Sequence, residues 1–432
     1  MVASLLAFTP AEPAPRLIGA VPVIGTPNAL GMMWSNSNFY YTCTAAPLKS
    51  RVLLTAAHCV SVDDFGAVVS PGAISLTPLG GTLRVNGAGL VGASPVRVTQ
   101  VVVPAGFTSP DDRVPANDIA LLVLGSDIGA SPYTRLATRV EVDRWVREQR
   151  AVDAIGYGLT AVGGTASEVP RQAQLPLAGL DPAYKGSTGW TIFSSAATGV
   201  NICSGDSGGP RFTTEQGATL LVAETAGGAC STVAGLTGAA FVPITYLDIV
   251  NPALAAAGFQ TIPSSPLEIK AAQVADSTTL WWSAPTVSPQ TATSYQVLDS
   301  VGAVLCSSGV TACTFPSATI TSTINVRSMN GEGEGDAALA PAADVLRPVA
   351  PAARAIKKRV RIFATAVDYP AVTSYVVRDK AGKKICTISP TAAPLACTVK
   401  LKPGSYRFRV EVVTPQGVTP ASVLSRSVKV RS

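Results

Sequence analysis

The sequence predicts an all-β protein, in which a many-stranded antiparallel barrel domain is followed by two small β modules. Short apolar runs such as Val52–Thr55, Val98–Val103 and Ile119–Leu124 alternate with Gly, Pro and Asn turns through the first 260 or so residues, which is typical of strands. Hydrophobic residues make up 47% of the chain and charged residues only 14%, so a large core is available and a disordered polymer is excluded. The uncharged stretch Thr225–Leu247 is long enough to cross a membrane by count. Its glycines, proline and hydroxyl residues favour buried barrel strands instead.

The chain divides into four segments: 1–16, 17–262, 263–347 and 348–432. The first begins with the apolar run Val2–Phe8 and is either the remnant of a signal peptide or the start of a propeptide. The second ends in a short helix that we expect to stop at Gly258. The proline-rich stretch Pro263–Pro266 then reads as a linker.

An internal repeat organises the last two segments. Thr293-Ser294-Tyr295 recurs as Thr373-Ser374-Tyr375, Gly302 recurs as Gly382, and Cys306 recurs as Cys386, always 80 residues later. The repeat predicts two copies of one β module. These modules resemble fibronectin type III or immunoglobulin-like sandwiches in architecture, with no motif that fixes the family.

Charge is distributed unevenly along the chain. From Val349 onward there are 16 Lys and Arg residues against 3 Asp and Glu, a net charge of +13, and the remainder carries 17 against 24, a net of −7. A basic last module on an acidic body suggests an anionic cell-surface or polysaccharide ligand, although a merely soluble, positively charged surface remains the alternative.

The eight cysteines fall into four local couples, which predict four disulfides and an oxidising, extracellular location. The couples are Cys43 with Cys59, Cys203 with Cys230, Cys306 with Cys313, and Cys386 with Cys397. A zinc site is a poor alternative because there is no Cys-x-x-Cys and because His58 is the only histidine.

Three segments carry residue types suited to nucleophilic catalysis: Leu54–Cys59 with His58, Asn117–Leu122 with Asp118, and Gly205–Pro210 with Ser207. Hydrolysis of a peptide by serine needs a hydroxyl, a base of near-neutral pKa, and an anion that holds the base in one tautomer. The backbone N–H groups of Gly205 and Ser207 could converge on one point and form an oxyanion hole.

The choice of Asp118 as the anion rests on the apolar residues that come directly after it. Asp111 and Asp112 are nearby rivals, but only Asp118 opens an apolar strand and should be carried into the barrel interior.

Together the three segments, in the order His, Asp, Ser, resemble the chymotrypsin/trypsin family of serine proteases over about residues 17–259. The resemblance implies a double six-stranded antiparallel β-barrel protease domain, a triad of His58, Asp118 and Ser207, and no cofactor. It also implies bridges from Cys43 to Cys59, beside the catalytic histidine, and from Cys203 to Cys230, beside the specificity pocket.

The resemblance further implies activation by cleavage. A new N-terminus at Leu17 would pair with Asp206; Val23 is a rival, and Leu17 departs from the usual Ile or Val. Asn201 would lie at the base of the specificity pocket, with Thr225 and Gly227 in its wall. Because Asn201 is uncharged, we expect an uncharged substrate side chain rather than a basic one.

Two functions are compatible with the same residues. The first is a secreted serine endopeptidase whose β modules serve for targeting. The alternative is a catalytically silent protease-fold protein that binds or adheres through its modules. The sequence contains no Walker loop, dinucleotide fingerprint or RNA-binding signature, so no nucleic-acid partner is expected.

Overall fold

The computed structural model describes residues 20–23, 28–35, 40–62, 67–86, 88–107, 114–195, 200–231, 233–235, 237–285, 292–300, 302–319, 323–331 and 333–431. Leu17, Asp111 and Asp112 lie outside these residues. The described chain consists mostly of strands with two α-helices, so the all-β prediction is confirmed. It forms two compact units: one extends to Ser264 and includes Asn330–Asp336, and the other holds most residues from Ser265 onward.

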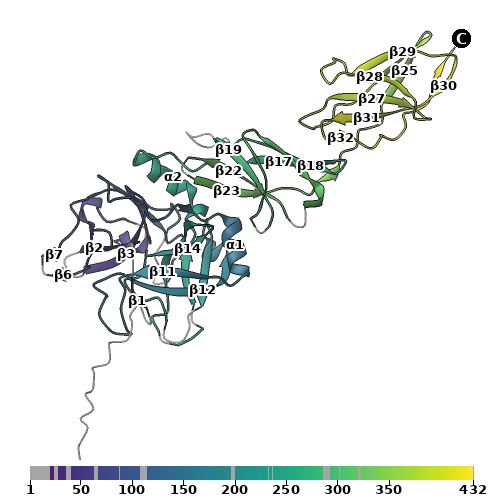
Figure 1. Ribbon diagram of the computed structural model, residues 1–432. Coiled ribbons are helices and arrows are strands. Elements are labelled where there is room, and N and C mark those ends of the chain that lie inside the picture. Colours follow the sequence, from purple (N-terminus) through teal and green to yellow (C-terminus); the bar gives the residue numbers. More distant parts are fainter. Residues whose placement is uncertain are drawn as a thin grey trace, which may run out of the picture. The chain divides into compact units, whose positions relative to one another are not determined.

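The first sheet of the N-terminal unit has six strands in the order β5-β2-β3-β4-β9-β8. Figure 1 labels two of them, β2 and β3, in purple. All neighbouring strands are antiparallel. Its strands are β2 (Leu30–Ser35), β3 (Tyr40–Lys49), β4 (Val52–Thr55), β5 (Ser75–Leu76), β8 (Val98–Val102) and β9 (Ala120–Leu124). A small hairpin of β6 (Val85–Asn86) and β7 (Gly89–Leu90) lies between β5 and β8 in the chain. Every residue of β4 and β9 is buried, which explains why both strands read as continuous apolar runs.

The second sheet closes on itself. Six antiparallel strands run in the order β12-β11-β14-β15-β16-β13, and a pairing between β12 and β13 completes the barrel. They are β11 (Ala151–Gly156), β12 (Arg171–Asp181), β13 (Thr191–Ser195), β14 (Pro210–Glu215), β15 (Ala218–Gly227) and β16 (Thr237–Phe241). Two further two-residue strands, β1 (Val21–Pro22) and β10 (Arg135–Leu136), attach to β12 and β15. The barrel therefore has the six strands that were expected, and the two short strands β1 and β10 extend its sheet to eight.

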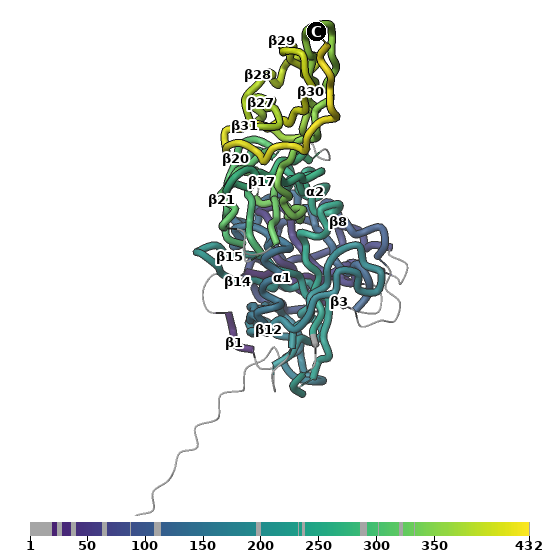
Figure 2. The backbone as a smooth tube through the Cα atoms, turned by 90° about the vertical axis from the view of Figure 1, so that its right-hand side faces the viewer, coloured from purple at the N-terminus to yellow at the C-terminus, as the bar shows by residue number. Residues whose placement is uncertain are grey.

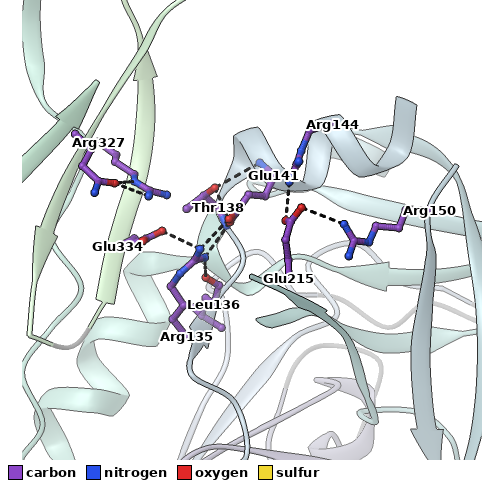
Figure 3. A network of polar contacts seen from close by, with 10 residues as sticks. Arg135, Leu136, Thr138, Glu141, Arg144, Arg150, Glu215, Arg327 and Glu334 are labelled. Carbon is purple, nitrogen blue, oxygen red and sulfur yellow. Dashed lines mark hydrogen bonds and ion pairs between the residues drawn. The ribbon is translucent and has the colours of Figure 1, made fainter. Parts of the chain in front are cut away.

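Helix α1 (Arg139–Arg147) was not expected from the sequence. It begins with a capping box, in which Thr138 accepts from the Glu141 backbone and the Glu141 side chain accepts from the Thr138 backbone. Figure 3 shows the same Glu141 carboxylate bound by Arg135, which also pairs with Glu334 at 3.0 Å. Helix α2 (Leu247–Ala256) does match the expected terminal helix, since Gly258 adopts a φ of 82° just beyond it. Among the residues described above, neither α-helix is long and apolar enough to span a bilayer.

Residues from Leu267 onward form several small antiparallel sheets. Two have four strands each, β21-β18-β17-β24 and β20-β19-β22-β23, and β24 runs parallel to its neighbour β17. Their strands are β17 (Leu267–Val274), β18 (Ser277–Ser283), β19 (Ser294–Leu298), β20 (Val304–Ser308), β21 (Ala312–Pro316), β22 (Asn325–Asn330), β23 (Gly333–Leu339) and β24 (Asp344–Val345).

The C-terminal strands form a group of their own, yellow-green in Figure 2. Its sheets have the orders β25-β26-β29, β28-β27-β31-β32 and β30-β33. The strands are β25 (Ala352–Ile356), β26 (Arg359–Phe363), β27 (Ser374–Asp379), β28 (Lys384–Ile388), β29 (Ala396–Lys400), β30 (Gly404–Tyr406), β31 (Phe408–Thr414), β32 (Gly417–Val418) and β33 (Val428–Val430). Ten buried residues, among them Val360, Val377, Phe408 and Val410, give this group its own core.

The 80-residue repeat corresponds to one hairpin built twice. In β19–β20, Val297 lies opposite Cys306, and in β27–β28, Val377 lies opposite Cys386; both hairpins shift register at the next residue. Disulfides join Cys306 to Cys313 and Cys386 to Cys397, as the spacing predicts. The residues that repeat in the sequence are therefore paired in the same register in both hairpins.

Candidate active site

His58 and Asp118 meet at the end of the first sheet. Asp118 Oδ2 lies 2.7 Å from His58 Nδ1, and Asp118 Oδ1 accepts the backbone N–H of His58 at 2.8 Å. Asp118 is fully buried, whereas the His58 side chain is 29% exposed. Burial lowers the pKa of His58, but the charge of Asp118 and its hydrogen bond outweigh burial and raise it overall. The carboxylate thus fixes both the ring and the backbone of the only histidine.

Asn117 fixes Asp118 in turn. It has a φ of 53°, a conformation that Asn tolerates better than most residues. Its backbone N–H donates to Ser187 Oγ at 3.0 Å, and its Oδ1 accepts the backbone N–H of Thr188 at 2.8 Å. The two neighbouring residues therefore have different roles: Asn117 anchors the turn, and Asp118 projects into the interior.

Ser207 sits in a loop held mainly through its carbonyl groups. Thr44 of β3 donates its backbone N–H to the Ser207 carbonyl and its hydroxyl to the Gly205 carbonyl, both at 2.8 Å. The Ser204 carbonyl accepts from Leu159, and the Asp206 carbonyl accepts from Gly209.

Because peptide bonds are trans, these last two bonds turn the N–H groups of Gly205 and Ser207 the opposite way. Among the described residues, neither N–H has a protein acceptor. Gly205 has a φ of 95°, and a Cβ added to it would lie only 3.0 Å from Gly158 Cα, so glycine is required there on both counts.

A cavity of about 430 Å³ brings His58 and Ser207 together. Its other lining residues are Pro115, Cys203, Ser204 and the run Ala226–Cys230. Within the described chain no hydrogen bond joins Ser207 to the ring; His58 Nε2 instead lies 3.6 Å from Cys59 Sγ. Disulfides connect Cys43 to Cys59 and Cys203 to Cys230, as predicted. The Cys203–Cys230 bridge lines this cavity, and Cys59 is the residue after His58.

The trypsin family profile matches residues 25–250, just over half of the chain. The chain belongs to the trypsin family. This match includes the segments of His58, Asp118 and Ser207, and the closed barrel with its six-stranded partner sheet fits the double-barrel domain of the family.

Three curated relatives of the trypsin-family chain share one printed name, chymotrypsin-like elastase family member 1. The rat protein is 30% identical over 183 residues, 41% of this chain and 64% of the relative. The bovine protein is 28% identical over 204 residues, 45% and 72% respectively, and the human protein is 29% identical over 182 residues, 41% and 66%. The chain therefore spans about two thirds of the length of these relatives, and more than half of it lies outside the match.

Asp206 is buried beside the cavity loop. Its Oδ1 accepts the backbone N–H of Gly158 at 2.8 Å, and its Oδ2 accepts that of Cys203 at 2.9 Å. Within the described part of the chain no cation pairs with it, and burial raises its pKa to about 7. A Cβ at Gly156 or Gly158 would collide with the carboxylate, so two glycines make the slot in which it lies.

The residues expected in the specificity pocket differ in where they lie. Gly227 lines the cavity, whereas Asn201 and Thr225 are buried and do not face it. Asn201 Oδ1 accepts the backbone N–H of Ile202, and its Nδ2 has no hydrogen-bond partner among the described residues.

Sequence reasoning missed Thr44, which touches the Ser207 loop from 161 positions away in the chain. No local signal marks such a residue. The role of Asn117 could have been suspected, because Asn preceding a buried strand residue is a frequent turn former.

Proposed function

We propose that this chain is a secreted serine endopeptidase that hydrolyses peptide bonds through an acyl-enzyme. The observation that carries the proposal is the 2.7 Å contact between His58 and Asp118, with Ser207 lining the same cavity. Ser207 attacks the peptide carbonyl as His58 takes its proton, and Asp118 holds the ring with Nδ1 protonated and stabilises the cation that forms. His58 then gives the proton to the leaving amine, and water hydrolyses the acyl-enzyme by the same steps in reverse.

The N–H groups of Gly205 and Ser207 are the proposed oxyanion hole. Two observations support this. Within the described chain neither N–H donates to a protein acceptor, and hydrogen bonds hold the carbonyl groups of the preceding residues, Ser204 and Asp206. Such preorganised donors stabilise the developing oxyanion without reorganisation during the reaction. The missing contact between Ser207 and His58 is the one that we expect substrate to complete, since catalytic hydrogen bonds are often long in the free enzyme.

We propose that cleavage before Leu17 activates the chain. The carboxyl of Asp206 is fully buried, and a new ammonium would supply its counter-ion and lower its raised pKa. Ala20, three positions after Leu17 in the sequence, is buried in one cluster with Ile202, the neighbour of Cys203 whose N–H binds Asp206. Cleavage before Val23 fits less well, because it would remove β1 from its pairing with β12.

Covalent labelling with a fluorophosphonate tests the endopeptidase and its activation together. The processed chain should be labelled at Ser207. The Ser207→Ala variant should not be labelled, and its kcat should be about 10⁵–10⁶-fold lower. Ser405→Ala, an exposed serine of β30, is the matched control and should label fully. N-terminal sequencing of the labelled species should begin at Leu17. A chain that is processed and folded but never labelled would favour the silent binding protein, and full labelling with Met1 attached would refute activation by cleavage.

We also propose that residues 263–347 and 348–432 are two β-sandwich modules of fibronectin type III or immunoglobulin-like architecture. Support comes from the repeated hairpin register and from the separate core of the last group of strands. Secretion is proposed with them, because four disulfides suit an oxidising compartment.

The last module offers a specific place for an anionic polysaccharide. Lys358, Lys400, Lys402 and Arg431 surround a cavity of about 460 Å³, together with Leu401 and Pro403. All four cations are exposed, and within the described chain none has an acidic partner. The three acidic residues after Val349 are engaged elsewhere: Asp368 pairs with Lys270, Glu411 with Arg378, and Asp379 binds its own turn. Four unneutralised cations around a concave site favour a polyanion.

Charge removal in the full-length Ser207→Ala chain tests this site. Changing Lys358, Lys400, Lys402 and Arg431 to Gln should weaken binding to immobilised dextran sulfate about 10-fold or more at 0.15 M salt. The matched control removes four exposed cations of the same module, by changing Lys380, Lys383, Lys384 and Arg426 to Gln, and should bind nearly as the parent does. Equal losses in both variants would assign the binding to net charge and refute the site.

A further inference from the structure

Arg211 is a buried cation four residues after Ser207. It lies on β14, is fully buried, and donates only to neutral groups: Nη1 to Ser194 Oγ at 2.7 Å, Nη2 to the Ala239 carbonyl at 3.3 Å, and Nε to Thr225 Oγ1 at 3.4 Å. Within the described chain no carboxylate lies within ion-pair distance. Burial lowers the pKa of Arg211 to about 10, so the guanidinium remains charged at neutral pH. Buried charges are ordinarily paired, and this one is not.

Glu224 is the buried acid that acts electrostatically on Arg211, although the two side chains form no ion pair in the described chain. It is fully buried on β15, and neither carboxyl oxygen completes a hydrogen bond, although the backbone N–H of Phe241 approaches it. Burial, followed by the negative charge of Asp118, raises the pKa of Glu224 well above its usual range, and Arg211 opposes this only in part. Within the described chain Glu224 makes no ion pair or hydrogen bond with Arg211, so the guanidinium has no carboxylate in direct contact.

The guanidinium lies directly behind the cavity wall. A Cβ placed on Gly238 would be 3.0 Å from Arg211 Nη2 and 3.4 Å from the carbonyl oxygen of Gly227, which lines the cavity. Because residue 238 is glycine, it places no side chain of its own between the cation and the wall; the Ile202 side chain packs at the same place, with Cγ1 3.3 Å from that Cβ position. Asn201 adds a second unsatisfied donor in this region, since its buried Nδ2 has no partner among the described residues.

We infer that the pocket beside Ser207 selects an acidic side chain, Glu or Asp, in the substrate residue whose carbonyl is attacked. The inference rests on the proposed endopeptidase function. A carboxylate entering the cavity would supply the anion that Arg211 lacks, and at this depth the attraction is only weakly screened by solvent. It replaces the uncharged preference that Asn201 alone suggests, because the deciding charge comes from a strand that begins after Ser207.

Two peptides that differ only in Glu or Gln at the cleaved position test the inference, because the side chains have the same shape and differ in charge. The unaltered, processed chain should cleave the Glu peptide with a kcat/KM about 10-fold or more above that of the Gln peptide at pH 7.5. Arg211→Gln should bring this ratio close to one. Arg84→Gln, which removes an exposed arginine paired with Glu168, is the matched control and should leave the ratio unchanged.

The outcomes separate the two proposals. Fluorophosphonate titration counts competent sites in each variant, so a drop caused by misfolding is recognised. If Arg211→Gln does not fold, the ratio of the unaltered chain decides by itself. A labelled chain whose ratio is one or lower overturns the acidic preference alone. A ratio that survives in folded Arg211→Gln overturns the role of Arg211. A processed chain that is neither labelled nor active on any peptide overturns the endopeptidase proposal beneath it.

Discussion

Replacing Asp118 with Asn is expected to reduce kcat/KM by about 10³–10⁴-fold without unfolding the domain. The carboxylate accepts two hydrogen bonds, from the backbone N–H of His58 and from its Nδ1. An amide of the same shape has one oxygen and one NH₂ group, so it cannot accept both. If the NH₂ group faces Nδ1, the ring is held in the tautomer that protonates Nε2, and Nε2 can no longer take the proton of Ser207.

The pH profile of the same variant tests whether Asp118 acts through His58. Asp118 holds the pKa of His58 above its ordinary value, against the effect of burial. Catalysis needs neutral His58, so activity falls as the pH drops through that pKa. Without the carboxylate, the pKa of His58 falls, and the acid limb of kcat/KM should shift to lower pH even though the rate is lower throughout.

Asp127→Asn is the control, because Asp127 is exposed and binds only Ser50 Oγ in the contacts of the described chain. It should leave both the rate and the acid limb in place. An Asp118→Asn enzyme with an unmoved acid limb and a rate within 10-fold of the parent would show that another group orients His58.

Gly208→Ala is expected to prevent the N-terminal unit from folding, or to destabilise it by on the order of 4 kcal/mol or more. A Cβ at this position would lie 2.1 Å from Thr55 Oγ1 and 2.2 Å from the Thr44 carbonyl oxygen. Both atoms belong to the adjacent strands β3 and β4, and they are joined by a hydrogen bond, so neither can withdraw cheaply. The Gly208 N–H also donates to the Thr225 carbonyl at 2.6 Å, which holds the loop against β15.

Gly217→Ala separates this collision from backbone strain. Gly208 and Gly217 have φ angles of 79° and 80°, but a Cβ at Gly217 meets nothing within 4 Å. Gly217→Ala should therefore cost only about 1–2 kcal/mol, the strain of a positive φ. Thermal unfolding of the two variants, followed by a probe specific to the N-terminal unit, measures the difference. Equal melting temperatures would show that the loop relaxes away from the strands.

The features that the sequence predicted correctly are those encoded within short stretches of chain. The strand that begins after Asp118 and the helix that ends before Gly258 depend on neighbours a few positions away, and the four cysteine couples join residues 7 to 27 positions apart. The 80-residue offset belongs with them, because identical local patterns build identical hairpins. Helix α1 shows the limit of local patterns. Its capping box at Thr138 and Glu141 is visible in the sequence, but the many strand-like segments around it led us to expect no helix there.

Features that depend on distant contacts needed the tertiary structure. Thr44 and Ser207 are 163 positions apart, and only the packing of one sheet against the other brings Thr44 into hydrogen-bonding distance of the Ser207 loop. Arg211 makes the same point, because its hydrogen-bond partners Ser194 and Ala239 belong to other strands.

By itself, then, the sequence determined which side chains are available for catalysis, since this is a property of residue type. Only the tertiary structure decided which charged side chains are buried and which of them are paired. The physical reason is that the strength of a charge depends on its burial and its neighbours, and folding sets both.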